Sequence, residues 1–408
     1  MSTTTHADVL ILGGGLVGAT LALALARHGL SAVVVDPADP AVTLAPGFDG
    51  RASAIASASG RMLGAIGVLD RLEGLGQPIG SIRVSDGLRP GRLDFTPDAD
   101  DGALGVMYEN RALRRALHAA LGEAAAVDLR MRTRTVSVER GEHGVTATLD
   151  DGGTVRAPLL IAAEGRNSPT RAAAGINVAR WRYDDAAIIG AFHHARPHGG
   201  VAYEIFYPAG PFALLPLVDD AGGHRSAMVW TVAEGDAAGM LKLSDRAFLH
   251  EAEKRMGGFL GALSGASARS SYPLGFHLAS RIVAERLALV GDAAHGIHPI
   301  AGQGLNLGLR DVAALTEVLV EGKRTGLDLG DPALLARYRR WRALDTGAIA
   351  AATDGLARLF GISGRTASAV RRLGIGAVNA IDPLKRAFMA EARGEAGALP
   401  MLLRGSLV

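Results

Sequence analysis

The sequence contains no cysteine and carries almost no net charge. Without cysteine among its 408 residues, the chain cannot form disulfide bonds, cysteine-ligated zinc sites, iron–sulfur clusters or a catalytic thiol. Lys and Arg total 43 and Asp and Glu total 41, so no overall field attracts nucleic acid or an acidic membrane. We therefore expect no nucleic-acid partner, and a reducing compartment is compatible with the composition.

The chain also lacks a long apolar run. The apolar stretch at 21–26 is far below the roughly 20 residues that a membrane-spanning helix needs. The N-terminal sequence MSTTTHADVLILGGG has neither a positively charged segment nor a long apolar one, so no secretory signal is predicted. These features predict a cytoplasmic protein that is at most peripheral to a membrane.

A glycine loop near the start of the chain predicts a dinucleotide site. Residues 8–12 are a short apolar run typical of a buried parallel strand, and residues 16–28 have helical character. Between them, Gly13–Gly18 has the spacing GxGxxG, which permits a tight turn and the close approach of a pyrophosphate. Asp36 follows the second strand, where its carboxylate can accept ribose hydroxyls. A merely tight strand–helix turn is the alternative interpretation.

A second loop, within Leu287–Asp311, distinguishes FAD from NAD. It runs from an apolar strand through Gly291 and Asp292 into a helix that begins near Gly304. An NAD site needs no second loop so far along the chain, whereas a flavin needs support for its ribityl chain and its ring. Asp292 can bind the ribityl hydroxyls, and backbone N–H groups at 304–306 can face the ring. An ordinary strand–turn–helix is the alternative.

The pattern of apolar runs predicts an α/β domain interrupted by a second domain. Residues 159–163 form another buried strand, residues 186–232 alternate like an antiparallel sheet, and the chain beyond Pro332 has helical patterning. We expect a Rossmann-like FAD-binding domain, an antiparallel β-rich substrate domain and C-terminal helices. The expected boundaries are 1–75, 101–180 and 271–332 for the FAD-binding domain, 76–100 and 181–270 for the substrate domain, and 333–408 for the helical region.

Two other features have a functional and a structural interpretation. His193, His194 and His198 cluster in the β-rich region, and His295 and His298 flank the second loop. Metal binding is the functional interpretation, but neither set has a carboxylate at ligand spacing, so no metal is expected. The run 337–342 (RYRRWR) interleaves arginines with aromatics, which can indicate RNA contact. A solvated helix face with two packed aromatics is the favoured interpretation.

Together with the segment EGRNSPTR at 164–171, the two loops resemble the fingerprints of group A flavoprotein monooxygenases. Glu164 departs from the family pattern, which usually has Asp. Within the family, GPFALLPL at 210–217, ATDGLARLF at 352–360 and the segment 382–405 resemble ubiquinone-biosynthesis hydroxylases. From the loops and this resemblance together, the expected cofactor-binding residues are Gly13, Gly15, Leu16, Val17, Gly18, Asp36, Arg51, Asn110, Glu164, Gly165, Arg166, Gly291, Asp292, Pro299, Gly302, Gly304, Leu305 and Asn306.

The resemblance implies hydroxylation of a polyprenylated phenol in ubiquinone biosynthesis. It implies that NAD(P)H reduces FAD, that O₂ adds to the flavin as a C4a-hydroperoxide, and that the distal hydroxyl passes to the ring. The substrate would lie between the flavin and the β-rich sheet, with residues 203–217 as a wall. The catalytic residues, including any base that deprotonates the phenol, cannot be named from the sequence. The apolar side chains near the C-terminus have three possible roles: to receive the isoprenoid tail, to dock on the inner membrane or a biosynthetic complex, or to cover the core. These side chains are Leu384, Phe388, Met401, Leu402 and Leu403.

Three alternatives to this function remain at the level of sequence. One is a hydroxylase of a soluble aromatic compound, although no arginine in the β-rich region stands out as the partner of a substrate carboxylate. Another is a flavin halogenase, but the tryptophans at 181, 230 and 341 are isolated and the motif GWxWxIP is missing. The third is a non-catalytic subunit that presents lipid within the biosynthetic complex.

Overall fold

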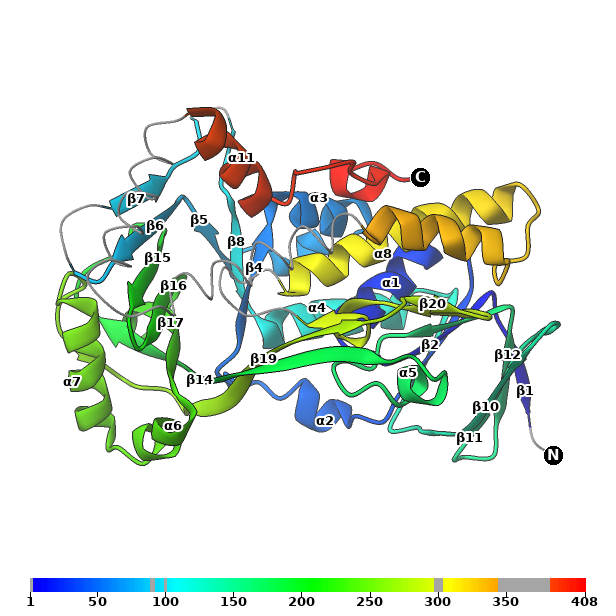
Figure 1. The fold of residues 1–408 in the computed structure, drawn as a ribbon, viewed down its shortest axis with the longest axis horizontal. Helices are drawn as coiled ribbons and strands as arrows, with labels where there is room; N and C mark the ends of the chain where they lie inside the picture. Colours follow the sequence, from blue (N-terminus) through cyan, green and yellow to red (C-terminus); the bar gives the residue numbers. More distant parts are fainter. Residues whose placement is uncertain (1–2, 89–91, 99–100, 297–303, 344–381) are drawn as a thin grey trace.

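The computed structural model describes residues 3–88, 92–98, 101–296, 304–343 and 382–408. Its described strands form four sheets, and two of them, of six and nine strands, lie at opposite ends of an elongated molecule (Figure 1). Among the described residues, no helix is both long enough and apolar enough to cross a bilayer.

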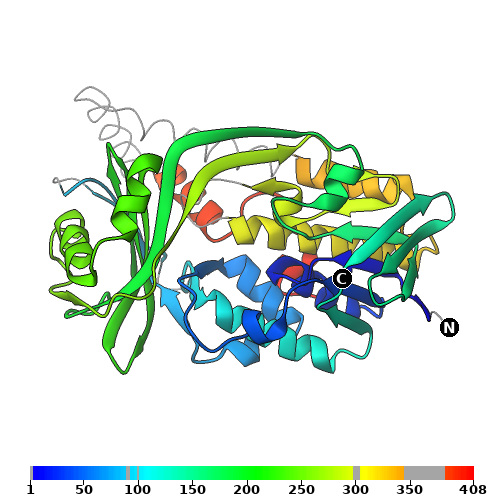
Figure 2. The same cartoon turned by 90° about the horizontal axis from the view of Figure 1, so that it is seen from below.

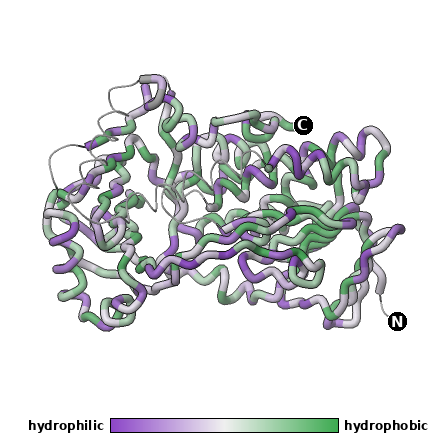
Figure 3. The backbone as a smooth tube through the Cα atoms, in the orientation of Figure 1, coloured by the Kyte–Doolittle hydropathy of each residue, from purple (hydrophilic) through white to green (hydrophobic). Residues whose placement is uncertain are grey.

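The six-stranded sheet is the core of the cofactor domain. Its central strands are short apolar runs buried on both faces, as expected for a parallel sheet covered on each side (Figure 3). The strands predicted at 8–12, 32–35 and 159–163 are thereby confirmed, as is the helix predicted at 16–28, which is α1 (Leu16–Ala26). In spatial order the strands are β20 (Val283–Ala284), β21 (Leu287–Leu289), β13 (Leu159–Ala162), β2 (Val9–Leu12), β3 (Ala32–Asp36) and β9 (Val127–Met131).

The nine-stranded sheet forms the other end of the molecule, and helices α6 (Glu234–Leu241) and α7 (Asp245–Met256) lie on its outer side (Figure 1). The β-rich prediction for 186–232 is confirmed. Strands β14 and β19 extend from this sheet along the cofactor domain, and so connect the two parts (Figure 2). The members of the sheet are β6 (Ser81–Asp86), β7 (Arg92–Phe95), β14 (Val178–His194), β15 (Val201–Tyr207), β16 (Gly210–Asp220), β17 (Gly223–Ala233), β18 (Leu263–Ser264), β19 (Ser270–Ala279) and β22 (His295–Gly296).

Two smaller sheets complete the described strands. One contains β4 (Ala52–Ala56), β8 (Gly105–Glu109) and β5 (Gly76–Ile79), and it packs against one face of the nine-stranded sheet. The other covers the far face of the six-stranded sheet and contains β1 (Thr4–His6), β12 (Thr154–Ala157), β11 (Gly144–Leu149) and β10 (Thr135–Gly141). The short helical segments are α2 (Pro40–Thr43), α3 (Ser57–Ala65), η1 (Leu69–Leu72), α4 (Asn110–Glu123), α5 (Pro169–Ala173) and η2 (Gly291–Ala293).

The helical C-terminal region packs on α8. This helix spans Gly304–Arg324 and confirms the helix predicted from residue 304. Residues 332–343 are helical, α11 spans Asp382–Ala392, and η4 spans Met401–Arg404; the motif at 352–360 lies outside the described residues. Leu402 and Leu403 are fully buried in the main core, so for these two side chains the core-covering interpretation holds. Phe388 and Met401 are exposed, and the side chain of Leu384 is not described.

A buried carboxylate on α8 organises the second loop. Asp311 is 1% exposed, and its Oδ2 accepts the backbone N–H of Gly291 at 2.8 Å and a ring N–H of His295 at 2.7 Å. Its Oδ1 accepts Nε of Arg342 at 2.6 Å. Burial raises the pKa of Asp311, but His295 and Arg342 outweigh that effect and hold the pKa below its ordinary value. The carboxylate is therefore ionised and connects the loop, α8 and the helix at 332–343.

The prediction of a solvated face for 337–342 is wrong for Arg342. This guanidinium is 1% exposed and ion-paired with Asp311, because the helix packs onto the buried side of α8. Tyr338 is also fully buried and donates its hydroxyl to the carbonyl of Leu289, as expected for a packed aromatic. Arg337 does lie at the surface, where it pairs with Glu321.

We expect Asp311→Asn to lower the free energy of unfolding by about 3–5 kcal/mol, because the substitution removes the buried negative charge with which Arg342 is paired. Urea unfolding of the FAD-saturated protein measures the effect. The matched control is Asp328→Asn, which removes a half-exposed partner of Arg286 and should cost only about 0–1 kcal/mol. Equal losses in the two variants would contradict the role given to the buried carboxylate.

Candidate functional site

The first glycine loop has the geometry of a phosphate-binding turn. Gly13 has a φ of +103°, and a Cβ there would lie 2.5 Å from the carbonyl oxygen of Ala163. A Cβ at Gly18 would lie 1.9 Å from the carbonyl oxygen of Gly13, so α1 can pack against the strand only without a side chain here. Gly15 differs, because a Cβ there would meet nothing within 4 Å. Gly15 thus opens onto free space at the N-terminus of α1, where a phosphate is favoured.

Asp36 lies beside this loop, as the sequence predicts. Its Oδ2 accepts the backbone N–H of Gly14 at 2.6 Å and its Oδ1 accepts that of Ala38 at 2.7 Å. Each oxygen keeps a lone pair for a ligand hydroxyl. A cavity of about 80 Å³ adjoins the carboxylate and is lined by residues that include Arg114 and His118 on α4. Sequence reasoning missed these two residues, since only the packing of α4 shows which of its faces meets the loop.

The two glycine loops, nearly three hundred residues apart, are in contact through Val17. A Cβ at Gly308 would lie 2.8 Å from Cγ2 of Val17, and one at Gly291 would lie 3.1 Å from the same atom. Both glycines are therefore required for the side chain of Val17 to fit between α8 and the second loop. The prediction that the loops form one site is supported by this contact.

Arg171 connects the segment 164–171 to the second loop. Its guanidinium is buried and donates to the carbonyl oxygens of Ala293 and Arg166, both at 2.9 Å. Glu164 turns towards α5, because its Oε2 accepts the hydroxyl of Ser168 at 2.5 Å and the N–H of Thr170 at 3.2 Å. A contact of Glu164, Gly165 or Arg166 with the cofactor stays a prediction.

Asp292 presents its carboxylate outward from an otherwise buried segment. Gly291 and Ala293 on either side are buried, whereas Asp292 is exposed and its carboxylate has no hydrogen-bond partner among the described residues. His277 fixes the backbone, since its ring nitrogen donates to the carbonyl of Asp292 at 2.7 Å. Burial lowers the pKa of His277, so the neutral ring makes this bond. His277 was missed because nothing in the sequence of β19 separates it from other strand residues.

Two more predicted residues, Arg51 and Asn110, lie where β4 meets α4. The backbone N–H of Asn110 donates to the carbonyl of Arg51 at 3.0 Å, and its side chain accepts the hydroxyl of Ser53 at 2.7 Å. Arg51 and Arg166 both lie near Tyr272 on β19. Burial raises the pKa of Tyr272, and the two positive charges partly oppose that shift. The structure thereby brings residues 51, 110 and 166 into one region between the sheets.

The start of α8 is tied to this region by Asn306. Its buried side chain accepts the N–H of Ala56 at 3.0 Å and donates to the carbonyl of Ala54 at 2.8 Å. The side chain is therefore structural, and a ligand contact by the backbone at Gly304, Leu305 or Asn306 stays a prediction. Pro299, Gly302 and His298 lie outside the described residues.

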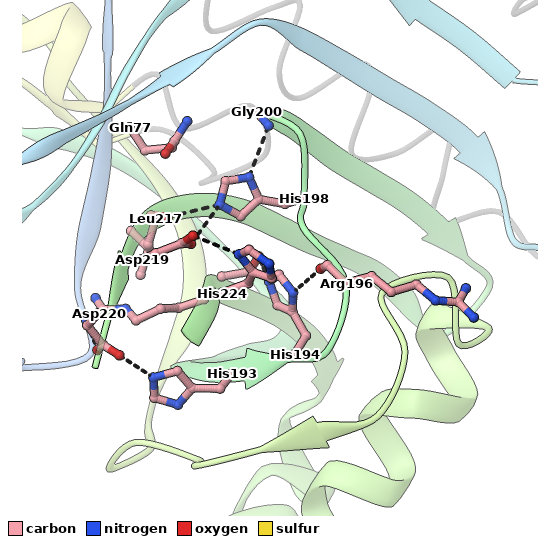
Figure 4. A network of polar contacts seen from close by, with 12 residues as sticks. Gln77, His193, His194, Arg196, His198, Gly200, Leu217, Asp219, Asp220 and His224 are labelled. Carbon is pink, nitrogen blue, oxygen red and sulfur yellow. Dashed lines mark hydrogen bonds and ion pairs between the residues drawn. The ribbon is translucent and has the colours of Figure 1, made fainter. Parts of the chain in front are cut away.

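The histidines of the β-rich region form a hydrogen-bonded network at one end of the central strands β14, β16 and β17 (Figure 4). His193 contacts Asp220 at 2.7 Å, and His224 contacts Asp219 at 2.7 Å. His194 is buried, and its two ring nitrogens contact Ser226 and the carbonyl of Arg196. Carboxylates do reach these histidines in space, yet no group of three or more His, Asp or Glu side chains in the described chain is arranged to hold a metal ion.

His295 likewise has a structural partner, because its Nε2 contacts Oδ2 of Asp311. A larger cavity, about 650 Å³, lies between β17 and helices α6 and α7. It contains none of the residues expected to bind a cofactor. The candidate site is therefore the region between the glycine loops and the inner face of the large sheet.

The chain is similar to known flavoproteins in sequence and in fold. A family model described as an FAD binding domain matches residues 6–351. Ubiquinone hydroxylase UbiL from Rhodospirillum rubrum is 49% identical over 98% of this chain and 93% of its own length. The 3-demethoxyubiquinol 3-hydroxylase of Escherichia coli is 32% identical over 96% of this chain and all of its own length. The structure of PqsL, a probable FAD-dependent monooxygenase from Pseudomonas aeruginosa, superposes with a TM-score of 0.74 at 26% identity, covering 91% and 100% of the two chains.

The geometry fits FAD at several points. Open space lies at Gly15 for a pyrophosphate, Asp36 has lone pairs for the adenosine ribose, and Asp292 offers a carboxylate to the ribityl hydroxyls. Val17 brings these parts together, which a site for a single phosphate would not require.

We expect Gly15→Ala to weaken FAD binding by about tenfold, or about 1.4 kcal/mol, while the apoprotein stays folded. The added methyl meets no protein atom within 4 Å and so intrudes only on a ligand in the loop. Flavin titration followed by fluorescence measures the affinity, and circular dichroism checks the fold. Gly18→Ala is the contrasting variant, which should misfold because its methyl strikes the backbone. Unchanged affinity in Gly15→Ala would place the pyrophosphate elsewhere.

Asp292→Ala should yield protein depleted of yellow FAD, because the ribityl hydroxyls lose their carboxylate acceptor. The ratio of flavin to protein absorbance in purified protein is the measurement. Asp70→Asn, at an exposed position in η1, is the control and should keep full flavin content. Full flavin retention in Asp292→Ala would show that this carboxylate does not hold the cofactor.

Proposed function

This chain belongs to the FAD binding domain family, and from that membership we propose that it hydroxylates the aromatic ring of a polyprenylated phenol in ubiquinone biosynthesis. It is an FAD-dependent aromatic hydroxylase that uses NAD(P)H as reductant and O₂ as oxygen source. The observation that carries the proposal is the 49% identity to a ubiquinone hydroxylase along 98% of the chain. The assembled cofactor site supports it independently.

FAD, when bound, supplies the redox and oxygen chemistry, and the protein binds, orients and shields it. The turn at Gly13–Gly18 and the N-terminus of α1 hold the pyrophosphate, Asp36 binds the ribose and Asp292 binds the ribityl chain. Arg51 and Arg166 supply positive charge near Tyr272, at the boundary between cofactor and substrate. The apolar inner face of the large sheet would keep water away from the reacting part of the bound cofactor.

The aromatic ring of the substrate lies between the start of α8 and the inner face of the large sheet. Its isoprenoid tail leaves along α11, where Phe388 is 42% exposed and its ring centroid lies 6.2 Å from that of Phe95 on β7. Met389 on the same helix packs on the apolar cluster between the two sheets. These apolar side chains would contact an isoprenoid tail that passes along α11. The isoprenoid tail of the substrate is the ground on which we extend the proposal to association with the inner membrane or with a biosynthetic complex.

A strain without this protein should accumulate a prenylated phenol that lacks one ring hydroxyl. Extraction and mass spectrometry of quinone intermediates measure it, and the wild-type gene should restore ubiquinone whereas Asp292→Ala should not. Purified enzyme should hydroxylate a short-chain prenylphenol in preference to hydroxybenzoate. A strain that accumulates no phenolic intermediate would refute the ubiquinone assignment, and a preference for hydroxybenzoate would favour the hydroxylase of soluble aromatics.

A further inference from the structure

The two faces of the large sheet differ in the size of their side chains. The outer face, towards α6 and α7, carries Phe212, Trp230 and Ile188 in one apolar cluster. The inner face of the central strands alternates alanines with larger apolar residues such as Ile189, Val229 and Leu215, and some of its residues pack against Phe48 and Ala52 next to the cofactor domain. The alanines are much smaller than the aromatic side chains of the outer face. The inner-face alanines are Ala187, Ala191, Ala202, Ala213 and Ala227.

Glu204 lies on the inner face, between Ala202 and Phe206 of its own strand. Residues alternate between faces along β15, so Glu204 shares its face with Ala202 and not with Ile205, which belongs to the outer cluster. Its cross-strand neighbours are Ala213 on β16 and Val84 on β6. A carboxylate therefore projects from an otherwise apolar stretch of the sheet.

The same stretch faces the backbone next to the expected flavin ring. Ala202 and Leu215, which flank Glu204 and Ala213 on the inner face, pack in one cluster with Ala52 and Ala54 of β4. The carbonyl of Ala54 is held by Asn306 at the start of α8. Glu204 is thus on the wall that closes the space between the sheet and the cofactor site.

The carboxylate of Glu204 has no partner among the described residues. Glu204 is partly buried, and no described residue forms a hydrogen bond or ion pair with it. Other charged or titratable groups on the inner face are Asp86 on β6, Arg225 on β17, His193 on β14 and Tyr272 on β19. Arg225 pairs with Glu109 and Asp220, His193 contacts Asp220, and none of these groups is bonded to Glu204. Burial raises the pKa of Glu204 to about 7. An unpaired carboxylate in apolar surroundings costs stability, so a structural role is a poor explanation for its presence.

We propose that Glu204 is the general base that deprotonates the phenol during hydroxylation, an inference that rests on the proposed function. The O–H bond of the phenol breaks, its electron pair stays on the oxygen, and the proton adds to a carboxylate oxygen of Glu204. The resulting phenolate is more electron-rich at the ring carbon that receives oxygen. When the hydroxylated ring regains aromaticity, the C–H bond at the hydroxylated carbon breaks, its electron pair returns to the ring and its proton leaves to solvent. The carboxylic acid of Glu204 then returns its proton to the phenol oxygen.

The acidity of Glu204 suits this role. A phenol has a pKa of about 10, so little phenolate exists in neutral solution. A general base works best when its own pKa lies near the operating pH, and such a base contributes about 10²–10⁴ in rate. Because the base must be ionised, activity should fall as the pH drops below about 7.

The test compares Glu204→Gln with wild-type holoenzyme on a short-chain prenylphenol. We expect kcat/KM for hydroxylation to fall by about 10²-fold, with FAD content unchanged and with the acid limb of the pH profile lost. Glu204→Asp should recover part of the activity and the pH dependence. The control Glu251→Gln, at an exposed position on α7 on the other side of the sheet, should behave as wild type.

Substrate acidity separates a base from a structural residue. On ring-fluorinated prenylphenols, which ionise more readily, the deficit of Glu204→Gln should shrink, whereas a packing defect would slow every phenol equally. An active wild type with an unchanged Glu204→Gln rate and pH profile would overturn the base alone. A wild type that hydroxylates no prenylphenol, despite bound FAD, would overturn the proposed function and the base with it.

Discussion

The buried carboxylate of Asp311 is the interaction on which the cofactor site depends. An ionised group with almost no exposure persists only when hydrogen bonds and counter-charges replace its hydration, and here Gly291, His295 and Arg342 provide them. These partners come from the second loop and from the helix at 332–343. One charge therefore fixes the loop that presents Asp292, the start of the C-terminal region and α8 relative to one another.

Steric exclusion complements this electrostatic constraint. The side chain of Val17 occupies the space left by Gly291 and Gly308, and Gly13 approaches the backbone of Ala163 too closely for any side chain. The first glycine loop thus meets two segments that are distant in the sequence, the one at Ala163 and the one that contains Gly291 and Gly308. A glycine makes room for the contact in both places. The residues that we propose to face the cofactor, by contrast, have free space or free lone pairs, as Gly15 and Asp292 do.

The large sheet forms the second wall of the proposed site, and its two faces have different roles. Its outer face is filled by bulky side chains that hold α6 and α7, which stabilises the domain through apolar burial. Its inner face carries alanines between larger apolar residues, together with the carboxylate of Glu204. The long strands β14 and β19 join this sheet to the cofactor domain, so the wall and the cofactor loops belong to one framework (Figures 1 and 2).

The sequence alone determined the βαβ unit, the cofactor loops with Asp36 and Asp292, and the β-rich domain, because these depend on local periodicity and on glycine spacing. It could not reveal that Arg342 is buried, since a run of arginines is normally solvated and only helix packing brings it to Asp311. Nor could it single out His277, Arg114 or Glu204, because strand and helix residues acquire a role only from the face they present to distant elements. Local patterns are encoded within a few residues, whereas burial, pKa and partnership arise from contacts that only the tertiary structure creates.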